Sequence, residues 1–116
     1  MAKYRTMQDA VAQFQKAFGR PTDLNFSDME ISSDVAKTFG LRQALIEEEF
    51  YELVKAMNEK NEQNIKKESA DLLYVLAGLF VDFGWDMQLY LIEYTNQICQ
   101  NLTKMVSLST EKTAKY

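Results

Sequence analysis

Apolar residues recur at helical spacing along four stretches of the chain, with turn-forming residues between them. The first stretch covers residues 4–18 and is followed by Gly19 and Pro21, which stop helices. Its apolar positions lie three or four residues apart, at Met7, Val11, Phe14 and Phe18. Residues 20–31 then mix turn formers with a few apolar side chains, which is typical of a loop packed across a helical bundle.

Three further helices are predicted after this loop. Ser32 or Ser33 can cap a helix that runs to about Asn58. The next helix extends over about 62–83 and ends at Gly84, and Asp86 can cap a fourth. The apolar side of the fourth helix comprises Leu89, Ile92, Cys99, Leu102 and Met105. The pattern therefore predicts one all-α domain of four main helices over residues 1–106, with a C-terminal tail over 107–116.

Acidic residues interrupt the apolar faces of the second and third predicted helices. At about 100° per residue, Glu49 and Glu52 fall inside the apolar arc of their helix, with Glu48 at its margin. On the next helix Glu68 lies within the apolar stripe, and Asp71 lies one turn along at its edge. Adjacent glutamates alone usually form a solvated helix face. Because a short connection makes these helices antiparallel, both acidic pairs can meet in the bundle.

Several facing carboxylates repel, and burying them without partners costs several kcal/mol each. A divalent cation with oxygen ligands removes that cost. The chain has no histidine, and oxygen donors without His or Cys suit Mg²⁺ or Mn²⁺ rather than Zn²⁺. A di-iron bundle would need Glu-x-x-His motifs, which a chain without histidine does not have. Since Mg²⁺ favours sites completed by substrate phosphates, the pattern indicates a polyphosphate substrate.

Composition limits the expected partners, location and assembly of the protein. The 116 residues carry a net charge of -4, which argues against nucleic acid as a partner. A single cysteine, Cys99, excludes an internal disulfide framework, fits a cytoplasmic location and is expected in the core. No signal peptide or apolar run of the ~20 residues that span a membrane is evident. The broad apolar helix faces predict a homodimer or homotetramer.

The acidic motifs carry a family resemblance. EEFYE at 48–52, followed by ESAD at 68–71, resembles the EExxE…ExxD signature of the all-α MazG-like nucleoside triphosphate pyrophosphohydrolases. The similarity extends to FQKAFGRP at 14–21, ADLLYVLAG at 70–78 and NLTKM at 101–105. It implies a four-helix, bundle-like, oligomeric MazG fold. It also implies hydrolysis of a (d)NTP between its α- and β-phosphates, giving the monophosphate and pyrophosphate with Mg²⁺.

The resemblance also implies residue roles. Glu49, Glu52, Glu68 and Asp71 would hold the metal, and Glu48 would orient the attacking water beside Glu49. Lys104 would contact the phosphates, and Asn101 the sugar, base or phosphate. The remaining candidates for substrate binding are Arg42, Phe14 and Gln15.

Five of these candidates have alternative interpretations. Lys104 could be a snorkelling lysine and Asn101 a helix-surface residue. Arg42 either binds phosphate or pairs with an acid, and the pairing is slightly favoured. Phe14 is either a core residue, which is favoured, or a platform for a base. Gln15 stands where relatives often have His, so it bears on base recognition.

Two alternatives remain open for the function. The enzyme could act selectively on dUTP, dCTP, dGTP or phosphoribosyl-ATP. The chain could instead be a non-catalytic helical interaction module whose acids bind a structural cation.

Overall fold

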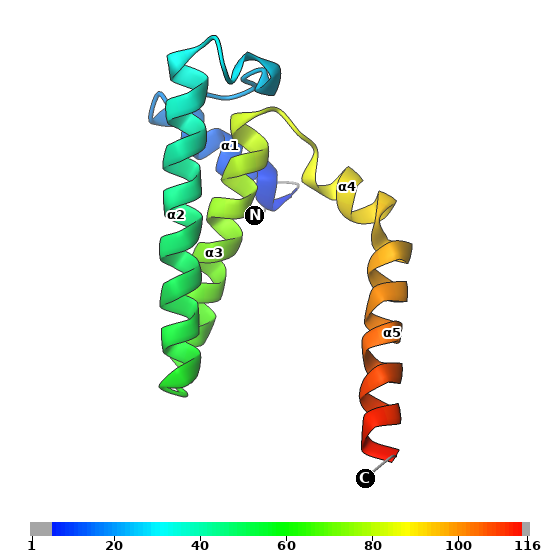
Figure 1. Ribbon diagram of the computed structural model, residues 1–116. Coiled ribbons are helices and arrows are strands. Elements are labelled where there is room, and N and C mark those ends of the chain that lie inside the picture. The colour runs from blue at the N-terminus through cyan, green and yellow to red at the C-terminus, as the bar shows by residue number, and fades with distance from the viewer. Residues whose placement is uncertain (1–5, 115–116) are drawn as a thin grey trace. The chain divides into compact units, whose positions relative to one another are not determined.

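The computed structural model describes residues 6–114, and all regular structure in that range is helical (Figure 1). In chain order the elements are α1 (Met7–Ala17), the short 3-10 helix η1 (Phe26–Asp28), α2 (Ser33–Asn58), α3 (Glu62–Asp82), α4 (Met87–Glu93) and α5 (Thr95–Ala114). The all-α prediction is confirmed for this range. The chain divides into two compact units between Trp85 and Asp86.

In the first unit, α2 and α3 form an antiparallel hairpin, and α1 packs against α3 (Figure 1). Side-chain caps set the N-terminal ends of both long helices, and the cap of α2 is the predicted Ser32. The Ser32 hydroxyl accepts the Val35 N–H and caps α2, while the Asn61 side chain accepts the Asn64 N–H and caps α3. Between them, Lys60 adopts a left-handed φ of 56°, which reverses the chain.

A buried polar network joins the three helices of this unit. Arg42 of α2 is 4% exposed and Asp82 of α3 is 0% exposed. Arg42 Nε donates to Asp82 Oδ2 at 2.8 Å, and Arg42 Nη2 donates to Oδ1 at 3.0 Å. From α1, Gln15 Nε2 donates to Asp82 Oδ1 at 2.9 Å, and Gln15 Oε1 accepts from Arg42 Nη2 at 3.2 Å. Each helix of the unit thus contributes one side chain.

The loop between α1 and α2 packs across the end of α3, as predicted. The N–H groups of Asp23 and Leu24 donate to the carbonyls of Val81 and Asp82, at 3.1 and 2.8 Å. Gly84 follows with a φ of 68°, and a Cβ there would lie 2.7 Å from Asp23 Oδ1. The ring of Phe26 contacts three further rings, those of Phe39, Phe83 and Trp85. Backbone bonds and aromatic packing therefore close this end of the unit.

The second unit corrects the prediction of one continuous fourth helix. Asp86 caps α4 by accepting the Leu89 N–H, as expected, but α4 ends at Glu93 and α5 begins at Thr95. The Thr95 hydroxyl donates to the Leu91 carbonyl, which is the acceptor that a continuous helix would offer to the Thr95 N–H. Residues from 107, expected as a tail, continue α5 to Ala114.

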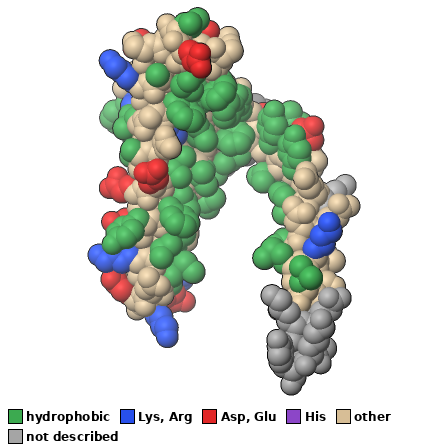
Figure 2. All heavy atoms as spheres, in the orientation of Figure 1, with side chains coloured by type: hydrophobic (Ala, Val, Ile, Leu, Met, Phe, Trp, Pro, Cys, Tyr) green, Lys and Arg blue, Asp and Glu red, His purple; other side chains and the backbone are tan. Residues whose placement is uncertain are grey.

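Many apolar side chains of the second unit are exposed in the single chain, including Leu89, Ile92, Ile98, Leu102 and Met105. Cys99, expected in the core, is exposed as well. Hydrophobic side chains are visible on the surface of both units (Figure 2). Within residues 6–114 no single helix is both long and apolar enough to cross a membrane, and α3 with α4 meets those criteria only as a pair.

Asp82→Ala is expected to lower the free energy of unfolding by about 3–5 kcal/mol, because Arg42 would stay buried without a counter-charge. Urea unfolding followed by circular dichroism measures the change. Asp34→Ala, which removes an exposed acid from the first turn of α2, is the control and should cost less than about 1 kcal/mol. Equal losses in the two variants would contradict a stabilising role for the Arg42–Asp82 pair.

Candidate metal centre

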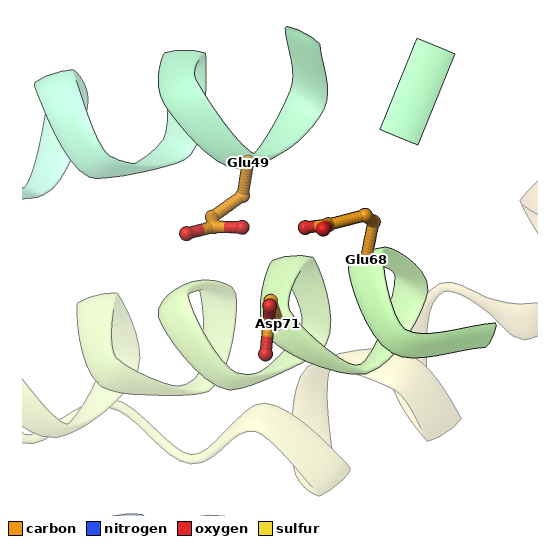
Figure 3. A group of neighbouring side chains, drawn as sticks. All are labelled: Glu49, Glu68 and Asp71. Atoms are coloured by element: carbon orange, nitrogen blue, oxygen red, sulfur yellow. The ribbon is translucent and has the colours of Figure 1, made fainter. Parts of the chain in front are cut away.

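Three acidic side chains converge between α2 and α3. Each of Glu49, Glu68 and Asp71 offers a carboxylate oxygen, and these oxygens all lie within 4.8 Å of one another. Figure 3 shows Glu49 reaching from α2 toward α3, with Glu68 extending into the same space. All three residues are intermediate in burial. The convergence expected from the two acidic motifs is therefore present for these three.

The hairpin explains why the acids meet. Glu68 and Asp71 are three residues apart on α3, so they lie on neighbouring positions of one helix face. The short turn after Asn58 returns the chain antiparallel to α2 and brings that face opposite Glu49. The site is thus built on two helices rather than on loops, which favours a fixed geometry.

The negative charges of the clustered acids repel one another. Burial raises the pKa of Glu49 above its ordinary value, and the negative charges of Asp71, Glu68 and Glu48 raise it further. Lys67 offsets part of this repulsion, since its Nζ donates to Asp71 Oδ2 at 3.0 Å and to Glu68 Oε1 at 3.2 Å. These hydrogen bonds to Asp71 and Glu68 raise the pKa of Lys67.

Lys67 was not among the residues singled out from sequence. Its spacing of four residues from Asp71 was the available signal, because such a pair lies on one helix face.

The donor set fits a hard divalent cation. All three side chains present oxygen, which Mg²⁺ and Mn²⁺ prefer. At an Mg²⁺–oxygen distance of about 2.1 Å, two oxygens that share an ion lie at most about 4.2 Å apart. The observed limit of 4.8 Å is within a small side-chain rotation of that value. Glu49, Glu68 and Asp71 could therefore hold one such ion, with waters or phosphate oxygens completing its coordination.

The other predicted acids lie beside this group. Glu52 is half-buried one turn further along α2 and does not belong to the group of three. Glu48 is exposed, and its charge contributes to the raised pKa of Glu49. The expected roles of Glu52 as a ligand and of Glu48 beside the attacking water stay predictions.

Arg42 and Gln15 are both buried and bonded to Asp82. The guanidinium of Arg42 is buried and pairs with Asp82, so the structure favours the acid-pairing alternative over phosphate binding. Gln15 is 4% exposed, and its amide also donates to the Pro21 carbonyl at 3.0 Å. It therefore holds α1 and the following loop rather than offering its amide to a base.

The remaining candidates are accessible in the chain. Phe14 is 50% exposed, at variance with the core position favoured from sequence, and its ring contacts those of Phe18 and Tyr74. Lys104 and Asn101 are exposed on α5, in the second unit. Contacts of Phe14, Lys104 and Asn101 with substrate stay predictions.

Comparison with known proteins adds independent information. A family model described as phosphoribosyl-ATP pyrophosphohydrolase matches residues 11–93, which contain all three converging acids. The chain belongs to this family. The phosphoribosyl-ATP pyrophosphohydrolase family lies within the all-α MazG-like superfamily, so the resemblance is confirmed at that level and not for a particular MazG family. The family is described by a pyrophosphohydrolase activity, which is the hydrolysis of an acid anhydride.

One curated relative adds similarity without a function. The chain is 39% identical over 79 residues to an uncharacterized protein of Acanthamoeba polyphaga mimivirus. The aligned region covers 68% of this chain but 31% of the viral protein. The chain thus corresponds to about a third of that relative's length. No solved structure gives a significant match.

Glu49→Gln is expected to stabilise the metal-free protein at about pH 7 and to have little effect at about pH 3. The raised pKa means that folded Glu49 holds its proton above about pH 4.3, where unfolded glutamate loses it. Ionisation of Glu49 therefore lowers the free energy of unfolding as pH rises through this window, and glutamine removes the effect.

Urea unfolding in EDTA at both pH values measures this difference. Glu59→Gln, at the exposed C-cap of α2, controls for the loss of one negative charge. A Glu49→Gln protein that is less stable than the unsubstituted chain at about pH 7 would contradict repulsion within the cluster.

Proposed function

We propose that the protein is a Mg²⁺-dependent nucleoside triphosphate pyrophosphohydrolase that cleaves the anhydride between the α- and β-phosphates. The products are a nucleoside monophosphate and pyrophosphate. The observation that carries the proposal is the convergence of Glu49, Glu68 and Asp71 within the part of the chain that matches a pyrophosphohydrolase family. Mn²⁺ should replace Mg²⁺, because it accepts the same oxygen ligands.

In this proposal Glu49, Glu52, Glu68 and Asp71 hold the ion. An ion held there would supply positive charge to neutralise the phosphate oxygens. Glu48 orients the attacking water and accepts its proton as the water oxygen bonds to phosphorus and the anhydride bond breaks. The leaving phosphate oxygen keeps the electron pair of the broken bond. Glu49 thus binds the ion while its neighbour Glu48 accepts the proton. This mechanism needs no histidine, and the chain has none.

The substrate contacts are proposed from the resemblance and from exposure. Lys104 is a point charge for the phosphates, Asn101 binds sugar, base or phosphate, and the exposed Phe14 ring stacks on the base. Arg42 and Gln15 are not included, because both are engaged in the buried network with Asp82. The exposed apolar residues of α5, such as Leu102 and Met105, support assembly as a homodimer or homotetramer. A cytoplasmic nucleotide pool would supply the substrate.

Phosphoribosyl-ATP is the second candidate substrate, because the matching family model is described by that activity. The scissile bond is again the anhydride between the α- and β-phosphates. The same acids could therefore act on it. The two candidate substrates differ at the base, because phosphoribosyl-ATP carries a phosphoribosyl group on its adenine.

A panel of nucleotides tests both candidates. The unsubstituted protein is incubated with Mg²⁺ and each of the common NTPs and dNTPs, or with phosphoribosyl-ATP, and products are separated by ion-exchange chromatography. We expect monophosphate and pyrophosphate in equal amounts, and no products in EDTA. Release of inorganic phosphate and a diphosphate would contradict α–β cleavage. Mn²⁺ binding by a folded protein without turnover of any substrate would instead support the non-catalytic module.

Asp71→Asn should lower kcat by at least about 100-fold, because a metal ligand loses its charge. Steady-state pyrophosphate release gives kcat, and circular dichroism checks that the variant is folded. The control is Asp34→Asn, which makes the same change at an exposed position in the first turn of α2 and should leave kcat unchanged. A folded Asp71→Asn protein with undiminished kcat would remove Asp71 from the metal ligands.

A further inference from the structure

The buried Arg42–Asp82 network and the acidic cluster belong to the same pair of helices. Arg42 precedes Glu49 by seven residues on α2, and Gly78 follows Asp71 by seven residues on α3. In an antiparallel pair, equal separations on both helices mean that Arg42 meets Gly78 in the same register in which Glu49 meets Asp71. The two contact points lie about two turns, or about 10 Å, apart along the helices.

Gly78 makes the Arg42 contact unusually close. A Cβ at position 78 would lie 2.3 Å from Arg42 Nη1, 2.6 Å from Cζ and 2.8 Å from Nη2. The guanidinium therefore lies directly against the backbone of α3, in space that only a glycine leaves open. The Nη1 group also donates to the Val75 carbonyl, one turn earlier on the same helix, at 3.5 Å. Arg42 thus contacts α3 through both its backbone and the Asp82 side chain.

Directional bonds fix this contact along the helix axis. Asp82 accepts two hydrogen bonds from Arg42, at 2.8 and 3.0 Å, and a third from Gln15 of α1. A slip of one residue moves a helix by about 1.5 Å, which carries such bonds beyond hydrogen-bonding distance. Apolar contacts between helices are non-directional and tolerate such a shift better. Metal ligands must hold their positions to within a few tenths of an ångström.

We propose that Arg42, Gly78 and Asp82 set the register of α2 against α3 and thereby position Glu49 opposite Glu68 and Asp71 for a divalent cation. These are positioning residues, since they act on the ion only through the helices that carry its ligands. The inference rests on the proposed function only in taking those acids as metal ligands. Buried ion pairs often add little stability compared with apolar side chains of similar size, so geometry and stability can be measured separately.

Mn²⁺ binding to the full chain without nucleotide tests this inference, with free Mn²⁺ measured by electron paramagnetic resonance and folding by thermal denaturation. Gly78→Ala should weaken Mn²⁺ binding by at least about tenfold in a protein that is still helical. The control is Gly40→Ala, the same change on α2 where a Cβ meets nothing within 4 Å, and it should leave affinity unchanged.

A second variant separates positioning from stability. Arg42→Met with Asp82→Leu replaces the charges by apolar side chains, and it should fold but bind Mn²⁺ at least about tenfold more weakly. Unchanged Mn²⁺ affinity in either folded variant, whatever its melting temperature, would overturn the inference, as would failure of both to fold. If the unsubstituted chain binds no Mn²⁺, both the metal centre and the positioning role are contradicted. Mn²⁺ binding without pyrophosphate release contradicts only the proposed function.

Discussion

The first unit must hold Glu49, Glu68 and Asp71 close together against the repulsion of their negative charges. Three carboxylates within 4.8 Å of one another must be held together by something other than their own interactions. The α2–α3 hairpin supplies the holding force through its short connection and through the buried contact of Arg42 with Asp82. Packing away from the site thus keeps the acids in place, and burial together with the neighbouring negative charges raises the pKa of Glu49.

Features set by neighbouring residues were predictable from sequence. The ends of α2 and α3 follow from the capping side chains of Ser32 and Asn61, each of which acts within three residues. The convergence of Glu49, Glu68 and Asp71 followed from helical periodicity and one short turn, and it could therefore be predicted from sequence. The acids of the cluster and the family resemblance pointed to the same class of chemistry.

Features set by distant or competing contacts were not predictable in the same way. The sequence favoured an acidic partner for Arg42, but Asp82 lies 40 residues away on another helix, so no local spacing identified it. Gln15 is likewise predicted to bear on base recognition, whereas its amide donates to Asp82 from a different helix. The break between α4 and α5 falls at Tyr94, within an apolar pattern that continues on both sides, so helical periodicity gave no signal for it.

The ammonium group of Lys67 changes what cation binding means for this site. Lys67 already contacts Glu68 and Asp71, so an ion that took the same two oxygens would displace an ammonium group from them. The net gain at the two acids is then one positive charge instead of two. Competition from Lys67 would raise the concentration of a divalent ion needed to occupy those oxygens. A substitution at this exposed position could adjust that concentration without altering any carboxylate.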